Sequence, residues 1–386
     1  MPIDFDALRR RFPLLARKTY LNSGSYCALA DSVRDAFNAY MDERLAVGAN
    51  WDVWVMKNEA VRAAMARVLR VAPDEIAVTA SASAGINALA SALDFTGPRR
   101  QVVVSDFEFP TNAQIWHAQE RRGAEVAHVP PSASGYIPLE NFARLIDDRT
   151  QLVAVTQVCF RNGARLDIAG ITRLAHERGA RVMVDCYQAV GAMTVDARAL
   201  GVDFAVGGML KYLLGTAGIG FLYVRSELVR ELVPGNSGWF AQQDIAAMDI
   251  RANRPAQSAR RFEAGTPPVA SCYAAEAGLR IVLETGTDAI EARVRTLTRR
   301  CMEGLAGIGW PAVTPADDER RGPMVAIPSS DAAGLVAQLL QQDIVTSFRG
   351  DNVRATLHCY NSEGDIDRFV AAMAAHRARF GPRGPA

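Results

Sequence analysis

Short apolar runs alternate with helical patterns along most of the chain, and this alternation narrows the possible folds more than any other feature. The runs are rich in β-branched residues and lie at 76–80, 102–106, 152–158, 181–186, 202–208 and 219–224. Patterns of helical period, such as AGITRLAHERGA at 169–180, take turns with them. Continuous apolar strands joined through helices predict a mostly parallel sheet that is buried under helices on both faces. The sequence therefore predicts an α/β fold.

The C-terminal third of the chain has a different pattern. A polar stretch at 251–268 is followed by a long helical pattern from Val269 to about Gly307. The strand-like segments MVAIP, IVTSFR and VRATLH and a final helix near 365–380 complete this region. We therefore predict three parts: an N-terminal segment, 1–20, that packs with the small domain; a large α/β domain, 21–250; and a smaller α+β domain, 265–386.

The charge balance bears on the kind of partner. The 386 residues include 43 Lys plus Arg and 42 Asp plus Glu, which leaves a net charge of +1. Such a balance does not favour binding to nucleic acid or to an anionic membrane surface, so we expect a small-molecule partner. The N-terminus lacks the apolar core of a signal peptide, and no window reaches the roughly 18 apolar residues of a membrane span. These features predict a cytoplasmic protein.

Metal, disulfide and nucleotide motifs are missing from the sequence. The six cysteines (Cys27, Cys159, Cys186, Cys272, Cys301 and Cys359) form no CxxC pair, and we interpret them as free, small hydrophobic residues. The five histidines form no cluster with metal-ligand spacing, so no metal site is predicted. GTAGIG at 215–220 precedes a strand instead of following one, which argues against a dinucleotide loop.

Polar residues lie at the carboxyl ends of two predicted strands, where open parallel sheets bind ligands. Asp185 ends the run RVMVD, although an aspartate there could equally be a helix cap or a solvated acid. Ser81 to Ser83 end another strand and begin a helix. Free backbone N–H groups and hydroxyls at such a point can hold a phosphate, but serine is also an ordinary N-cap residue.

Lys211 is an unusual cation because apolar and glycine residues surround it in VGGMLKYLLG. Loss of hydration lowers the pKa of a lysine and makes its free amine available as a nucleophile toward a carbonyl. The alternative is a lysine at a strand end whose side chain reaches solvent. The sequence therefore favours carbonyl-amine chemistry at Lys211 and leaves the second interpretation open.

The order of these elements resembles a known family. A phosphate-type turn, an aromatic residue, a strand-end aspartate and a lysine about 26 residues later are similar to pyridoxal 5′-phosphate (PLP) enzymes of the aspartate aminotransferase fold, specifically the class V aminotransferase group. That group includes cysteine desulfurases and kynureninases, and the resemblance extends from YLNSG at 20–24 to HCYNSEGDIDRF at 358–369. The segments closest to kynureninase-like members are FPTN at 109–112, TQVCFRNG at 156–163, KYL at 211–213, GWF at 238–240 and GTPP at 265–268. The resemblance implies fold type I, with a mostly parallel sheet of the seven-stranded type, flanking helices and a smaller α+β C-terminal domain.

The resemblance implies roles in holding PLP. Lys211 would join the cofactor covalently and then move the α-proton of the substrate. Asp185 would pair with the pyridine nitrogen and keep it protonated. Gln188 would hydrogen-bond the phenolic oxygen of the ring. Two further roles are implied: Phe109 stacks on the ring face, and Ala82 and Ser83 bind the phosphate at the start of a helix.

Other implied roles concern the substrate and a second subunit. Arg354, in GDNVRATLHCYN, resembles the arginine that binds the α-carboxylate of the amino acid, a task suited to a planar guanidinium. Thr266 resembles a residue that reaches the phosphate of the neighbouring subunit, and Trp239 belongs to a similar GW element, so a homodimer is implied. Trp51 and Trp54 are candidates for aromatic surface near the substrate, with core packing as the alternative.

The sequence also departs from its relatives. SFRGDNVR runs directly from Arg349 to Arg354 without the nucleophilic cysteine that cysteine desulfurases carry before this arginine, and Cys359 lies after it. Leu210 stands where desulfurases have His and kynureninases have Tyr, and Gln188 stands where kynureninases have His. We therefore expect an aminotransferase that acts on an α-amino acid or analogue, with a PLP-dependent β-lyase or hydrolase as the alternative. A non-catalytic or nucleotide-binding α/β protein is the competing class.

Overall fold

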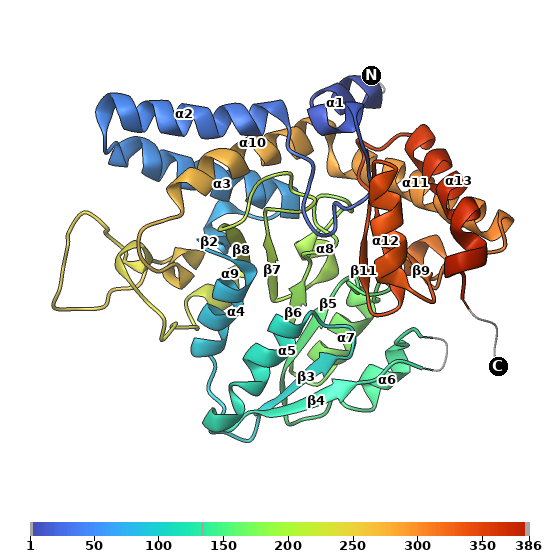
Figure 1. Cartoon of the computed structure of the whole chain (residues 1–386). Coiled ribbons are helices and arrows are strands. Elements are labelled where there is room, and N and C mark those ends of the chain that lie inside the picture. Colours follow the sequence, from blue (N-terminus) through green and yellow to red (C-terminus); the bar gives the residue numbers. More distant parts are fainter. Residues whose placement is uncertain (1–2, 133–134, 383–386) are drawn as a thin grey trace.

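A seven-stranded sheet forms the centre of the computed structural model, which describes residues 3–132 and 135–382 (Figure 1). Its strands are β2 (Ile76–Thr79), β3 (Gln101–Ser105), β4 (Glu125–Val129), β5 (Thr150–Thr156), β6 (Arg181–Asp185), β7 (Phe204–Gly208) and β8 (Gly220–Val224). They lie in the order β2-β8-β7-β6-β5-β3-β4. Strand β8 is antiparallel to β2 and to β7, and every other neighbouring pair is parallel. The predicted mostly parallel sheet of the seven-stranded type is confirmed.

The six predicted strands are present, but β4 was not predicted. It lies at the edge of the sheet, and all but the last of its residues are at least partly accessible. An edge strand buries little surface, so its sequence EVAHV carries charged and polar residues instead of a continuous apolar run. The apolar pattern that marks the inner strands is therefore missing from it.

Alternate residues of the inner strands belong to two separate hydrophobic clusters, as the period of a β-strand requires. Val103 and Val153 belong to the cluster that contains residues of α3 (Trp51–Leu69), α7 (Ile168–Glu177) and α10 (Val269–Thr285). Val102 and Leu152 belong to the cluster that contains residues of α4 (Ala82–Ser91) and α5 (Pro110–His117). Helices thus cover both faces of the sheet, and the inner strands are apolar on both sides.

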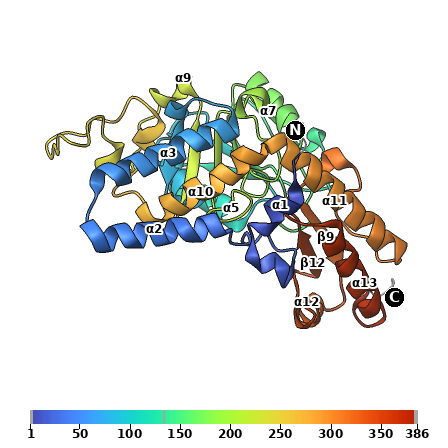
Figure 2. The ribbon, with the colours of Figure 1, turned by 90° about the horizontal axis from the view of Figure 1, so that it is seen from above.

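The predicted helix from Val269 to about Gly307 is two helices in the structure. Helix α10 ends at Thr285 and α11 (Thr287–Gly307) begins two residues later. Between them Gly286 has φ +83°, a conformation that glycine adopts without steric cost and that ends a helix. Helix α10 runs beside α3 and α2 (Asp31–Val47), and its C-terminal end leads into α11 (Figure 2).

The C-terminal region contains a small antiparallel sheet of the order β11-β12-β9. Its strands are β9 (Met324–Pro328), β11 (Ser347–Arg349) and β12 (Asn352–Thr356), with helices α11, α12 (Ala332–Gln341) and α13 (Glu363–Phe380) around them (Figure 1). The remaining short helices are α1 (Phe5–Arg10), α6 (Leu139–Ala143), α8 (Ala197–Leu200) and α9 (Ser226–Val229). The predicted α+β character of this region is confirmed.

The N-terminal segment contacts this C-terminal region. Strand β1 (Thr19–Tyr20) pairs in parallel with β10 (Ile344–Val345). Arg9 forms an ion pair with Asp365 of α13, with a nitrogen-to-oxygen distance of 2.6 Å. The exact limits of the three predicted domains stay a prediction. In the described part of the chain, no helix combines the length and the apolar character that crossing a membrane requires.

Candidate active site

A cavity of about 300 Å³ lies at the carboxyl ends of β5 and β6, beside the start of α4. This is the edge at which open parallel sheets bind their ligands. Of the nine predicted site residues, six line the cavity: Ala82, Ser83, Phe109, Asp185, Gln188 and Lys211. The structure therefore brings together side chains that the sequence separates by up to 129 positions, from Ala82 to Lys211.

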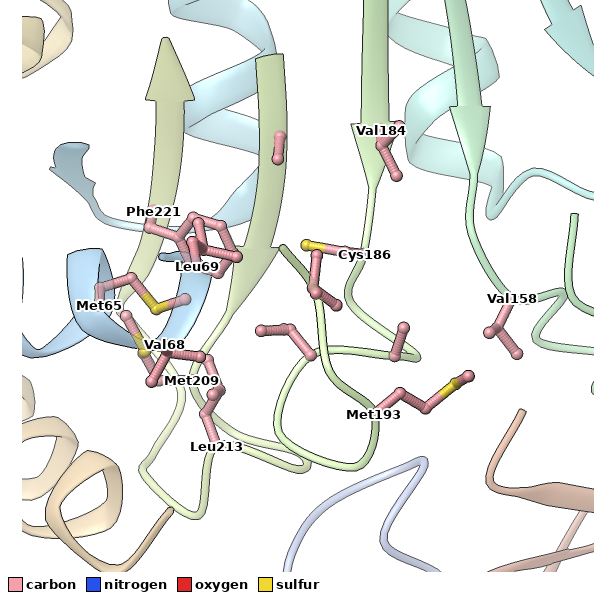
Figure 3. Packing of buried hydrophobic residues seen from close by; sticks show 14 of the residues in the cluster. Met65, Val68, Leu69, Val158, Val184, Cys186, Met193, Met209, Leu213 and Phe221 are labelled. Carbon is pink, nitrogen blue, oxygen red and sulfur yellow. The ribbon is translucent and has the colours of Figure 1, made fainter. Parts of the chain in front are cut away.

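Lys211 lies in the loop between β7 and β8, and hydrophobic packing fixes that loop. Met209 and Leu213, on either side of it, are buried in the cluster that includes Met65 and Leu69 of α3 (Figure 3). Backbone contacts hold the same loop: the carbonyl of Leu210 accepts a hydrogen bond from the amide of Cys27 at 3.0 Å, and the carbonyl of Tyr212 lies 2.9 Å from His358 Nε2. The apolar neighbours of Lys211 thus anchor the loop, while its own side chain lines the cavity.

Lys211 differs from the other two lysines of the chain. Lys18 and Lys57 form ion pairs with Asp343 and Glu276. Within residues 3–132 and 135–382, no side chain or backbone group forms a hydrogen bond or ion pair with Lys211 Nζ, which lies 4.3 Å from the ring centroid of Tyr187. An unpaired amine in an apolar setting is a potential nucleophile.

Burial lowers the pKa of Lys211 from 10.5 to about 8. The negative charge of Asp185 opposes this shift, whereas the positive charges of Arg354 and Arg349 add to it. Lys211 is therefore uncharged in a substantial fraction of molecules slightly above neutral pH.

We expect Lys211 in cofactor-free protein to react with an amine-acylating reagent along a pH profile whose midpoint is about 8. Only the uncharged amine is nucleophilic, so its reactivity rises as the pH increases through the pKa. Peptide mass spectrometry after brief labelling at a series of pH values separates Lys211 from Lys18 and Lys57, which serve as internal controls. A midpoint for Lys211 equal to that of an ordinary lysine would contradict the assignment.

Asp185 is the last residue of β6, and its side chain is buried. The amide of Tyr187 donates a hydrogen bond to its Oδ1 at 2.9 Å. Burial raises the pKa of Asp185, whereas this hydrogen bond and the charge of Lys211 lower it. A buried carboxylate with one backbone partner can accept a further hydrogen bond from a cationic N–H group in the cavity.

Gln188 lies one turn beyond Asp185 and has one polar atom without a partner. Its Nε2 donates to the carbonyl of Gly24 at 3.1 Å, while its buried Oε1 makes no hydrogen bond within the described residues. Gly24 allows this close approach, since a Cβ there would lie 3.2 Å from Oε1 and 2.8 Å from Thr356 Cγ2. An unsatisfied buried amide at a cavity wall is typical of a site that holds a polar ligand.

The first turn of α4 directs free backbone N–H groups toward the cavity. Ser81 is its N-cap, and the Ser81 side chain accepts a hydrogen bond from the amide of Ala84 at 3.1 Å. Ala82 and Ser83 begin the helix, where the helix dipole favours an anion. A Cβ at Gly220 of β8 would lie 2.9 Å from the nitrogen of Ala82, so glycine there lets the helix start close to the sheet.

Phe109 is 44% exposed and contacts Phe160 edge to face, with ring centroids 5.1 Å apart. The buried carboxylate of Glu108 accepts hydrogen bonds from the amide of Thr156 at 2.8 Å and from Asn112 Nδ2 at 2.6 Å. Burial raises the pKa of Glu108 to about 8. Glu108, the residue before Phe109, thus links this segment to β5 and α5. The sequence analysis missed Glu108, although Asn112 follows it by one helical turn.

Arg354, in β12, is 2% exposed and lies beside the cavity without lining it. Its Nη1 donates to the carbonyl of Phe160 at 2.6 Å and its Nη2 to Ser347 Oγ at 3.0 Å and Ser25 Oγ at 3.4 Å. Phe160 and Ser25 line the cavity. In the part of the chain that the structure describes, no carboxylate pairs with Arg354. Burial, with a contribution from Arg349, lowers the pKa of Arg354 to about 10.

Thr266 and Trp239 are not brought to the cavity of their own chain. Thr266 is exposed, and the Trp239 ring contacts Trp51 with centroids 5.3 Å apart. Trp51 also contacts Trp54, at 5.2 Å, so the three tryptophans form one aromatic cluster outside the cavity. Conversely, the sequence analysis did not single out Ser25, Thr111 and Tyr187, which line the cavity.

Metal ligands and reactive thiols play no visible part in this cavity. Across residues 3–132 and 135–382, no group of three or more His, Cys, Asp or Glu side chains is arranged to hold a metal ion. All six cysteines are buried and free, and none lines the cavity.

Comparison with known proteins identifies the family. The model of the family described as aminotransferase class-V matches residues 53–369. The chain belongs to the aminotransferase class-V family. It is 33% identical to the uncharacterized aminotransferase YcbU of Bacillus subtilis (strain 168) over 367 residues, which cover 95% of this chain and 96% of that protein. It is 34% identical to the kynureninase of Deinococcus radiodurans over 332 residues, which cover 83% of this chain and 78% of that protein.

A solved structure shares the fold. The apo structure of cysteine desulfurase from Thermococcus onnurineus NA1 superposes with a TM-score of 0.87 at 23% sequence identity, over 97% of this chain and 99% of that chain.

Enzymes of the class V aminotransferase family depend on PLP, and this member is a PLP-dependent enzyme. The residues around the cavity fit that cofactor. Lys211 offers an unpaired amine, Asp185 a buried carboxylate, Gln188 the second hydrogen of its amide nitrogen and α4 a free N-terminus. The chemistry of this set matches an aldehyde, a pyridine nitrogen, a phenolic oxygen and a phosphate.

Proposed function

We propose that this enzyme transfers the amino group of an α-amino acid, or a close analogue, to a 2-oxo acid acceptor. Two neighbouring cationic groups carry the proposal. The unpaired amine of Lys211 lines the cavity, and the buried guanidinium of Arg354 lies beside it and has no carboxylate partner among the described residues. A buried cation without a counter-ion favours an anionic ligand. The similarity to an aminotransferase over 95% of the chain supports the same class.

PLP bound in this cavity supplies an electron-accepting ring that stabilises negative charge at the substrate Cα. In our proposal Asp185 accepts a hydrogen bond from the protonated pyridine nitrogen, and its charge holds that proton in place. Phe109, which lines the same cavity, would pack against the ring. Ala82 and Ser83 would bind the phosphate through backbone N–H groups and the Ser83 hydroxyl. Gln188 Nε2, which gives one hydrogen to the carbonyl of Gly24, would donate its second hydrogen to the phenolic oxygen.

Lys211 and Arg354 act on the substrate in this proposal. The uncharged Lys211 Nζ removes the proton from the substrate Cα and later returns a proton, which a pKa of about 8 suits near neutral pH. Arg354 binds the α-carboxylate through its guanidinium, in which Nε has no partner among the described residues, and its bonds to Ser347 and Phe160 hold the guanidinium plane. A fixed carboxylate orients the Cα–H bond toward Lys211.

A β-lyase or hydrolase is the second candidate, because the chain is 34% identical to a kynureninase over 83% of its length. Cysteine desulfurase activity fits less well. Persulfide formation needs an accessible thiolate at the site, and all six cysteines are buried away from the cavity lining. Burial raises the pKa of Cys359, the cysteine that follows Arg354 in the sequence, to about 12.

One assay separates the two candidates. A panel of α-amino acids is incubated with the holoenzyme, with and without a 2-oxo acid, and new amino acid, ammonia and side-chain fragments are measured. Turnover that depends on the acceptor and yields its amino acid supports transamination. Release of a side-chain fragment without an acceptor would contradict transamination and favour the lyase.

Arg354→Lys should raise KM about 10- to 1,000-fold, or about 1.5–4 kcal/mol, because a point charge cannot replace two parallel hydrogen bonds to a carboxylate. Steady-state kinetics with the best amino acid of the panel provides the measurement, and bound-cofactor absorbance checks the fold. Arg349→Lys, on the same hairpin but exposed, is the matched control and should change KM little. An unchanged KM in Arg354→Lys would move the carboxylate site elsewhere, with Arg349 the next residue to test.

We also propose that the enzyme is a cytoplasmic homodimer in which Thr266 and Trp239 serve the neighbouring subunit. Both residues lie outside the cavity of their own chain, and the segment 237–254 extends away from the rest of the molecule (Figures 1 and 2). In that segment Ile250 is 95% exposed and Met248 63% exposed, which favours a protein contact. Sedimentation analysis should give twice the mass of one chain; a monomer at micromolar concentration would contradict the proposal.

A further inference from the structure

Two accessible histidines face each other at the edge of the central sheet, outside the active-site cavity. His117 is the last residue of α5 and His128 lies in the edge strand β4. Their Nε2 atoms are 3.0 Å apart, with ring centroids separated by 5.3 Å and ring planes inclined by 18°. Each ring has a carboxylate on its other side: Glu120 Oε1 lies 3.0 Å from His117 Nδ1, and Asp106 Oδ1 lies 3.0 Å from His128 Nδ1.

Two neutral imidazole rings cannot satisfy all three contacts of this group, and one additional cation, a proton or a metal ion, is required between the rings. A carboxylate oxygen can only accept, so each Nδ1 atom carries the proton that it donates outward. In a neutral imidazole the other nitrogen is then unprotonated, which leaves two Nε2 lone pairs facing each other at 3.0 Å. Two lone pairs at this distance repel, so a cation between them stabilises the arrangement.

We propose that His117 and His128 form a binding site for a divalent transition-metal ion of the Zn²⁺ class, with solvent as the remaining ligands. Two ligands about 2.0–2.1 Å from a metal in cis or tetrahedral positions are about 2.9–3.4 Å apart, which matches the observed separation of the Nε2 atoms. A carboxylate that accepts from the second nitrogen of each ligating histidine is the usual outer partner of such a site, because it fixes the tautomer and orients the ring.

The charges around the site favour a divalent ion over a single proton. Asp106 and Glu120 contribute two negative charges, which one divalent ion balances. His117 ends α5, where the helix dipole also favours a cation. The side chains of His117 and His128 are 43% and 39% exposed, so small ring rotations and entry of water ligands meet little resistance. With only two protein ligands, the site should bind the ion more weakly than a structural site with four protein ligands does.

Isothermal titration of the holoenzyme with ZnCl₂, without amino acids and in a buffer that does not chelate metals, tests the site. The parent should bind one Zn²⁺ per chain through this pair, and His117→Gln and His128→Gln should each weaken that binding at least tenfold. His376→Gln is the matched control, because His376 is a partly accessible histidine that contacts Gln342 and should leave Zn²⁺ binding unchanged. Circular dichroism melting curves verify that each variant is folded.

Either of two results would overturn the metal site. If the parent binds no Zn²⁺ at about pH 8, or if both single variants bind Zn²⁺ as tightly as the parent, the histidine pair holds only a shared proton. PLP and the buried cysteines are common to all variants, so Zn²⁺ bound by them cannot produce the expected difference.

Discussion

Lys211→Ala should reduce kcat by about three to six orders of magnitude, because it removes both the amine that joins the cofactor and the group that moves the substrate proton. Some PLP should still bind without a covalent bond, since the phosphate site at α4 and the carboxylate of Asp185 remain. Single-turnover kinetics and the absorbance of the bound cofactor measure the two effects separately. A smaller loss of rate would disagree with the structure, because no other lysine can replace Lys211. Lys18 and Lys57 form ion pairs with Asp343 and Glu276.

The control for this experiment is Lys57→Ala, which removes a partly buried lysine and its ion pair with Glu276 without touching the cavity. That variant should retain the parent rate within a factor of about three. Turnover by Lys211→Ala at the level of Lys57→Ala would refute the role of Lys211.

Asp185→Asn should retain the bound cofactor and lower kcat by about two to four orders of magnitude. The amide has nearly the shape of the carboxylate, and it can still accept the hydrogen bond from Tyr187. It lacks the negative charge that keeps the pyridine nitrogen protonated, so the ring stabilises charge at the substrate Cα less well. Rates measured from about pH 6 to about pH 9, together with the cofactor spectrum, test this expectation.

Asp94→Asn is a suitable comparison for Asp185→Asn, because Asp94 contacts Thr96 at an exposed turn. It should leave the rate unchanged. A parent-like rate for Asp185→Asn across neutral pH would show that the pyridine nitrogen has another partner.

The inner part of the fold was predictable because burial on both faces forces an apolar sequence on a strand. Strands β5 and β6 have this property and were predicted, whereas the edge strand β4 has polar residues and was missed. The break at Gly286 was missed for a different reason. Glycine occurs inside helices as well as between them, and only its positive φ in the structure distinguishes the two cases.

The candidate site was predictable where one residue is unusual for its immediate surroundings. Lys211 is a cation among apolar residues, and Asp185 is an acid at the end of an apolar strand. Glu108 and Ser25 carry no such local signal. Ser25 contacts Arg354 across 329 positions, and Glu108 matters because the amide of Thr156 happens to lie beside it. Such contacts depend on the folded arrangement of distant segments, which the local pattern does not contain.

The central claim is that Lys211 is the residue to which PLP attaches, and borohydride reduction of the holoenzyme followed by peptide mass spectrometry tests it most directly. The chain has three lysines, so each can be assigned without ambiguity. We predict that the reduced cofactor is found on the peptide that contains Lys211, in about one copy per chain, and that peptides with Lys18 and Lys57 are unmodified. A reduced cofactor on either of those lysines, or no covalent cofactor at all in a catalytically active protein, would contradict the account.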